Sequence, residues 1–223
     1  MKYVVAIVFL FAGLSSQAHP SWGIVVDDKG MIYFVDVMHH QGTLWKYHPK
    51  SGELKALVKG HFHAHGLQIA GRYLYIPTQI WIDGEVMGDG QNYLFRYNLE
   101  NGKLDTLLYH TSYDKFFGGN AVVHVVRQEA WYMRKNILYA VDIPSSKRKS
   151  ILKHPFERFT TMTFDKYGFL WLADAYAHGG SLYKWSKADG LKKYAENLIP
   201  EHPENPPYKE KNHQLIYSIG FSE

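Results

Sequence analysis

Histidine and aspartate residues recur in this sequence at spacings that suit metal binding or acid–base chemistry. The pattern Asp-x-x-x-His occurs twice, from Asp36 to His40 and from Asp174 to His178, and the two copies lie 138 residues apart. Three more histidines alternate in the segment His61-Phe-His-Ala-His65. Neutral imidazole and carboxylate groups are ligands for zinc and related divalent metals, and histidine can also act as a general base. These residues are therefore candidates for a metal site or a catalytic centre.

The two Asp-x-x-x-His copies belong to a longer repeat. The stretch from Trp22 to Asp36 has a short apolar run, a turn at Asp27-Asp-Lys-Gly30 and a second run of β-branched and aromatic residues. The pattern returns from Met162 to Asp174, with the turn Asp165-Lys-Tyr-Gly168, again 138 residues later. Aspartate and glycine between two such runs are typical of a β-hairpin turn. We therefore expect the candidate residues at strand ends.

Further runs of this kind divide the chain into four units of four strands. An aromatic content of 16% and frequent glycine, aspartate and asparagine turns predict an all-β fold. Four antiparallel strands in about forty residues are typical of one blade of a β-propeller. The expected strands are 24–26, 31–35, 43–47 and 53–58; then 66–69, 73–76, 93–97 and 103–108; then 121–126, 130–133, 137–141 and 149–152; and finally the hairpin 162–174 with 181–185 and 191–194.

Residues 216–223 repeat the pattern of a first strand. Two interpretations stay open: the sequence is part of a longer propeller, or it is a four-bladed ring with an extra terminal strand. Unpaired strand edges favour aggregation, which argues for the first interpretation. We expect one propeller domain over residues 19–223, incomplete at its C-terminus.

Residues 1–18 are expected to be a signal peptide. Lys2 precedes an uncharged apolar run over 3–14, and the small residues of Ser16-Gln-Ala18 predict cleavage after Ala18. The apolar run is too short to cross a bilayer as a helix, so we expect no stable membrane anchor. The chain has no cysteine, which excludes disulfides and thiolate ligands. These features predict a periplasmic or secreted protein.

The charge pattern argues against a nucleic-acid partner. The net charge is +4, and the basic residues are interleaved with acidic ones. The exception is Lys147-Arg-Lys149, which follows a predicted turn and is typical of a solvated hairpin tip. We therefore expect a ligand other than nucleic acid.

Propeller topology brings the candidate residues together at one end of the ring, called here the channel mouth. The segment before each first strand and the connection between the second and third strands both reach this end. A second interpretation of Asp36 and Asp174 is that they only cap the turns that follow their strands. The catalytic candidates are His65, His178 and His40; the candidate metal ligands are Asn120, Asp174, Asp36 and His63; and the aromatic residues expected to contact a ligand are Trp22, Trp81 and Tyr176.

The unit from Trp22 to Asp36, followed by Gly42-Thr-Leu-Trp-Lys-Tyr-His-Pro-Lys-Ser-Gly52, resembles the blades of the senescence-marker-protein, gluconolactonase and LRE-like group and of NHL-repeat propellers. The resemblance implies a six-bladed ring. It also implies lactone or ester hydrolysis with a divalent cation held by Glu, Asn and Asp. Asn120 matches this ligand pattern, whereas His19-Pro-Ser-Trp22 stands where the group has Glu and Thr160-Thr161 stands where it has Asp.

Two functions are consistent with these observations. The first is a metal-dependent lactone or ester hydrolase, with calcium or zinc at the channel mouth. The second is a non-catalytic, NHL-like exported propeller that binds a small molecule, peptide or glycan on the same face. The sequence leaves open whether the chain is an enzyme, its substrate and its oligomeric state.

Overall fold

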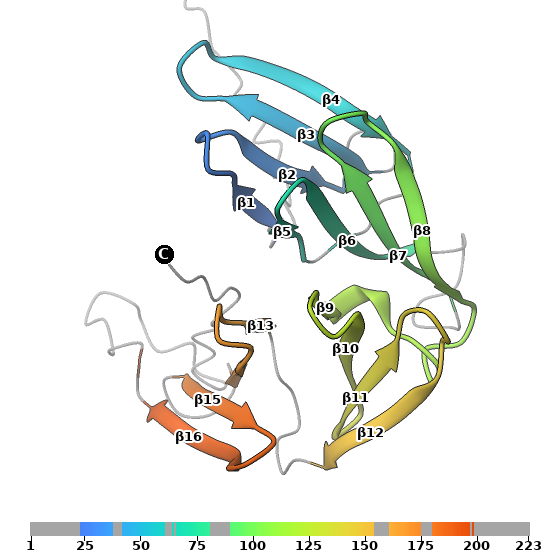
Figure 1. Ribbon diagram of the computed structural model, residues 1–223, viewed down its shortest axis with the longest axis vertical. Coiled ribbons are helices and arrows are strands. Elements are labelled where there is room, and N and C mark those ends of the chain that lie inside the picture. Colours follow the sequence, from blue (N-terminus) through green and yellow to red (C-terminus); the bar gives the residue numbers. More distant parts are fainter. Residues whose placement is uncertain are drawn as a thin grey trace, which may run out of the picture.

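The structure of this chain is a computed structural model that describes residues 23–37, 42–60, 64, 66–80, 90–153, 161–174, 180–196 and 198. Within these residues, four antiparallel sheets of four strands follow one another around a central axis (Figure 1). This arrangement is a β-propeller, and each sheet is one blade. The predicted all-β propeller of four-stranded blades is confirmed.

The strands run in chain order from the inside of each blade to its outer edge. Blade 1 contains β1 (Ile24–Val26), β2 (Ile32–Asp36), β3 (Thr43–His48) and β4 (Glu53–Lys59); blade 2 contains β5 (Gln68–Ala70), β6 (Tyr73–Ile80), β7 (Gln91–Asn98) and β8 (Leu104–His110); blade 3 contains β9 (Val122–His124), β10 (Glu129–Arg134), β11 (Ile137–Asp142) and β12 (Arg148–Lys153); and blade 4 contains β13 (Thr161–Phe164), β14 (Leu170–Asp174), β15 (Ser181–Ser186) and β16 (Gly190–Glu196).

Several expected boundaries differ from the structure, and two of these differences bear on the channel mouth and on blade 3. The connection expected over 78–92 is shorter, because β6 continues to Ile80 and β7 begins at Gln91. The strand expected over 121–126 ends at His124, although Val125 and Val126 favour a strand. A backbone hydrogen bond closes a turn there: Gln128 N donates to Val125 O at 3.1 Å, and Gln128 adopts a positive φ of 52°.

The repeated Asp turn has one structural role in blades 1 and 4. Asp27 Oδ1 accepts hydrogen bonds from the backbone N–H groups of Lys29 and Met31, and Asp27 Oδ2 accepts one from the Tyr33 hydroxyl. Asp165 repeats this arrangement with the backbone of Tyr167 and Phe169 and with the indole N–H of Trp171. The carboxylate therefore closes the turn and also fixes the first large side chain of the second strand.

A β-bulge occurs at the same place in all four blades. The register between the third and fourth strands shifts directly after a leucine, which is followed by an aromatic residue. Bulges increase the local twist of a strand pair, so the four blades share one twist at this step. The four leucines are Leu44, Leu94, Leu138 and Leu182.

Two hydrophobic clusters hold the blades together. The smaller joins blades 1 and 2 and includes Val35, Leu44 and Ile76. The larger joins blades 2, 3 and 4. It includes Trp131, whose ring centre lies 5.0 Å from that of Trp185 in the next blade. Aromatic side chains on strands thus pack between blades, where their large apolar area is removed from water.

The side of blade 1 that faces away from blade 2 carries exposed apolar side chains. Val25 packs in the cluster with blade 2, so the alternation of the strand turns Ile24 and Val26 to the other side. These two side chains are 61% and 55% exposed. Among the described residues, none belongs to a helix long and apolar enough to cross a membrane.

Candidate functional site

The channel mouth is the end of each sheet at which the second strand finishes. Because neighbouring strands are antiparallel, the third strand starts at this same end. The equivalent position in every blade is the second-strand residue that pairs with the residue directly before the bulge leucine. This position is occupied by Asp36, Thr78, Arg134 and Asp174, which pair with Thr43, Tyr93, Ile137 and Ser181.

Three of the predicted site residues lie within the described part of the chain. Asp36 and Asp174 end β2 and β14 at equivalent positions, as the repeat predicts, and Asn120 lies directly before β9. The other predicted residues, which are outside the described ranges, are His40, His63, His65, His178, Trp22, Trp81 and Tyr176.

Asn120 clamps two backbone segments of blade 3 together. It ends the short 3-10 helix η2 (Gly118–Asn120). Its side-chain N–H donates to Met133 O at 3.3 Å, and its side-chain oxygen accepts from Met133 N at 3.3 Å. The amide therefore extends the pairing of β9 and β10 in the way a backbone group would. This role explains the asparagine without a bound metal.

The described residues alone do not make up the metal site that the resemblance implies. Asp174 is buried and Asp36 is half-buried, and they stand in blades 4 and 1. Asn120 belongs to blade 3 and has its amide orientation fixed by both bonds to Met133. In the described ranges, no three His, Cys, Asp or Glu side chains are grouped closely enough to hold a metal ion.

A buried polar network at the blade 2 mouth was not found from the sequence. Gln79 and Asn92 face each other across β6 and β7, and both are buried. The Gln79 amide donates to the Tyr113 hydroxyl, and Asn92 Oδ1 accepts from Gly118 N at 3.1 Å. Buried polar groups need such partners. The network fastens the connector 111–121, which joins blade 2 to blade 3, onto the strand ends.

Arg134 presents a cationic group at the mouth of blade 3. Its guanidinium lies 5.3 Å from the centre of the Tyr113 ring, and its Nε lies 3.8 Å from Asp114 Oδ1, which is too long for a hydrogen bond. Nε is buried and has no hydrogen-bond partner among the described residues, while the whole side chain is 37% exposed. Packing therefore orients the guanidinium beside the Asp114 carboxylate, and because Nε is buried only the exposed part of the group is open to a ligand.

Aromatic residues near Arg134 are held in place by contacts between β10 and the connector 111–121. The Tyr132 hydroxyl donates to Asp114 O at 3.2 Å, and the Tyr132 and Phe116 rings meet edge to face at 5.6 Å. Burial raises the pKa of Tyr132, so its hydroxyl stays protonated and remains a donor. No sequence pattern indicates this site, because Arg134 ends a strand next to a short connection of ordinary composition.

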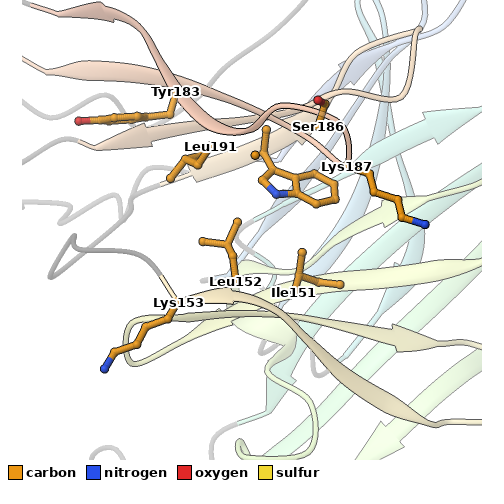
Figure 2. Close-up of a pocket in the computed structure, with 9 residues that line it drawn as sticks. Ile151, Leu152, Lys153, Tyr183, Ser186, Lys187 and Leu191 are labelled. Carbon is orange, nitrogen blue, oxygen red and sulfur yellow. The ribbon is translucent and has the colours of Figure 1, made fainter.

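A separate groove of about 560 Å³ lies between blades 3 and 4. Ile151 and Leu152 of β12 form one wall, and Trp185 and Leu191 of β15 and β16 form the other. Figure 2 shows Lys153 and Lys187 on opposite sides of these apolar side chains. The groove lies between outer strands, and none of the three described site residues, Asp36, Asn120 and Asp174, lines it. The sequence offered no pattern for it, because its walls come from two blades.

Comparison with known proteins shows the fold. No protein-family model and no curated protein matches the sequence. Among solved structures, the chain is similar to a chain from the nidogen/laminin complex, with 14% identity and a TM-score of 0.55 over 79% of this chain and 65% of that one. It is also similar to TolB from Acinetobacter baumannii, with 9% identity and a TM-score of 0.54 over 78% of this chain and 43% of that one.

The chain thus spans less than two thirds of the first structure and less than half of the second. At these identities the likeness shows the β-propeller fold alone. The resemblance to the gluconolactonase and NHL groups stays a prediction.

Proposed function

We propose that this chain is an exported, non-catalytic propeller that binds a carboxylate-bearing small molecule, glycan or peptide at the channel mouth. The observation that carries the proposal is Arg134, whose guanidinium rests on the Tyr113 ring and is partly exposed at the mouth. Arginine binds carboxylates through paired N–H donors, and orientation by packing lowers the entropic cost of that binding. Trp22, Trp81 and Tyr176 are the predicted apolar contacts of the same ligand.

The fold neighbours are consistent with a binding role. One of them is a chain from a complex of two proteins, nidogen and laminin. The proposal for the present chain rests on its own residues, since propellers of one fold serve many functions.

The test is a binding screen with a matched charge control. Full-length protein is screened against uronic-acid oligosaccharides and short peptides with a free C-terminal carboxylate, together with their amidated or reduced counterparts. We expect binding of the carboxylate forms that Arg134→Gln weakens at least tenfold, about 1.4 kcal/mol. Lys166→Gln removes the same charge from an exposed turn at the opposite end of blade 4 and should leave binding unchanged. Equal binding by wild type and Arg134→Gln would refute the proposal.

A second candidate is the metal-dependent lactone or ester hydrolase. The observation in its favour is the equivalent placement of Asp36 and Asp174 at the mouth. It requires a stoichiometric divalent ion, calcium or zinc, in purified full-length protein, and lactone turnover that is lost in Asp174→Ala and His65→Ala. Protein that contains no such ion and hydrolyses no member of a lactone panel excludes this candidate and leaves the binding role.

A further inference from the structure

We propose that the groove between blades 3 and 4 docks an acidic peptide segment that carries apolar side chains. This inference is separate from the ligand at the channel mouth, because Arg134 and the equivalent mouth residues Asp36, Thr78 and Asp174 do not line the groove. Its volume of about 560 Å³ lies in the range of protein ligand sites and accommodates several side chains.

The floor of the groove is apolar and firmly supported. Ile151, Leu152, Trp185 and Leu191 line it and also pack against the buried core that joins blades 2, 3 and 4. Tyr183, which is buried, completes the lining on the blade 4 side. These side chains are thus held in place before a partner arrives. Pre-ordered apolar walls favour binding because little side-chain entropy is lost on association.

The charge of the groove selects acidic partners. No carboxylate lines it, whereas exposed Lys153 and Lys187 stand on opposite sides of the apolar floor (Figure 2). Neither lysine forms an ion pair within the described residues. The neighbouring lysines differ, since Lys149 pairs with Glu129, and Lys192 and Lys193 pair with Asp189 and Glu196. The positive charges of Lys153 and Lys187 complement two separated carboxylates on a partner.

The strand edges favour a peptide as the occupant. β12 and β16 are the outermost strands of their sheets, so each has one backbone edge that no other described strand pairs. An extended peptide can place apolar side chains on the floor and also hydrogen-bond to such an edge. A small organic anion provides no equivalent main-chain contacts.

The probe is a fluorescein-labelled peptide of two glutamates, phenylalanine, leucine and two glutamates, followed by fluorescence anisotropy with the full chain. We expect saturable binding that weakens with added salt. A counterpart with glutamine in place of glutamate should bind at least tenfold more weakly. A counterpart with alanine in place of phenylalanine and leucine should also bind at least tenfold more weakly.

Two double variants test whether the peptide binds in the groove. The double variant Lys153→Glu/Lys187→Glu should weaken binding at least tenfold, and circular dichroism melting checks that it folds. The double variant Lys29→Glu/Lys50→Glu makes the same charge change at exposed positions of blade 1 and should bind as wild type does. Absence of binding, equal binding of the glutamine or alanine peptide, or unchanged binding by the groove variant would each overturn the inference. Self-association of the free chain that the groove variant abolishes would assign the groove to a second copy and also overturn it.

Discussion

Different side chains accept a turn hydrogen bond at equivalent positions of the four blades. In each outer hairpin, the residue four places after the bulge leucine accepts a hydrogen bond from a backbone N–H in the turn that follows. His48 accepts from Ser51 N, three places on, and Asn98 accepts from Glu100 N, two places on. Asp142 and Ser186 accept from the residues three places on, Ser145 and Asp189. The turn requires an acceptor and not a particular residue type.

His124 gives the stability of the fold a dependence on pH. Its ring meets the Phe164 ring at 4.7 Å, and its Nδ1 accepts from Arg127 N at 3.3 Å. Burial, helped by the positive charge of Arg127 and opposed by a hydrogen bond to its own backbone and by Glu129, lowers the pKa of His124 below its ordinary value of 6.5. The unfolded chain then binds a proton at a higher pH than the folded chain does.

We therefore expect stability to fall as the pH decreases from about 6.5 through the lowered pKa of His124. The free energy of unfolding of His124→Gln, measured by urea titration between pH 5 and 8, should fall less over this range than that of wild type. His110, whose pKa burial also lowers, remains in both proteins and supplies a common background. Parallel pH profiles of the two proteins would contradict this assignment.

The residue-scale predictions from the sequence succeeded where the partner is near in the chain. Asp27 and Asp165 act on residues two to six places away, so the Asp turn was readable as a local pattern. The clamp of Asn120 on Met133 and the contact of Gln79 with Tyr113 join residues far apart in the chain. Their partners depend on how strands and the connector come together in the folded chain, which no local spacing encodes.

At the scale of elements, the connector 111–121 determines how blade 3 meets blade 2. Its Phe116 is fully buried, and its η2 turn lies directly against the end of β6. Gly118 permits this approach, because a Cβ there would lie only 2.2 Å from Thr78 O. The sequence predicted the strands on either side but not this close contact.

Gly118→Ala should therefore destabilise the protein by at least about 2 kcal/mol, since the clash is with backbone and cannot be relieved by a rotamer change. The matched control is Gly66→Ala, where the nearest atoms to a new Cβ lie at 3.6 Å and no positive φ is required. That change should be nearly neutral. Urea unfolding of the two variants provides the measurement, and equal stability of both would show that η2 can shift away from β6.

At the scale of the whole molecule, the described blades share a core that is divided at blade 2. Blade 1 contributes to the smaller hydrophobic cluster, and blades 3 and 4 contribute to the larger one. The apolar contacts that hold blade 1 are thus fewer, and its other side is exposed at Ile24 and Val26. Regions with fewer buried apolar contacts open at lower free energy.

We expect amides of β2 and β3 to exchange with solvent before those of β10 and β11. Native-state hydrogen exchange at low urea, read by mass spectrometry of peptides from each blade, tests this order. Exchange of all four strands with one common urea dependence would instead show a single cooperative unit.

The predicted fold and the four predicted units are confirmed within the described residues, because each blade is written as a local strand pattern. The fifth first strand predicted over 216–223 lies outside the described residues. The match of Asp36 to Asp174 was confirmed as the same position in two blades. The groove and the Arg134 site were not predicted, since both arise from side chains of different segments that meet only when the chain folds.

The shared bulge has a consequence for protein engineering. The paired segments 44–54, 94–104 and 138–148 have equal length from the bulge leucine to the residue that pairs with the third residue after it. A hairpin from one of these blades therefore has the length and twist required in another. These three outer hairpins can therefore be exchanged between blades. A hairpin that carries a grafted binding surface keeps its inward-facing leucine, and only its outward side chains are replaced.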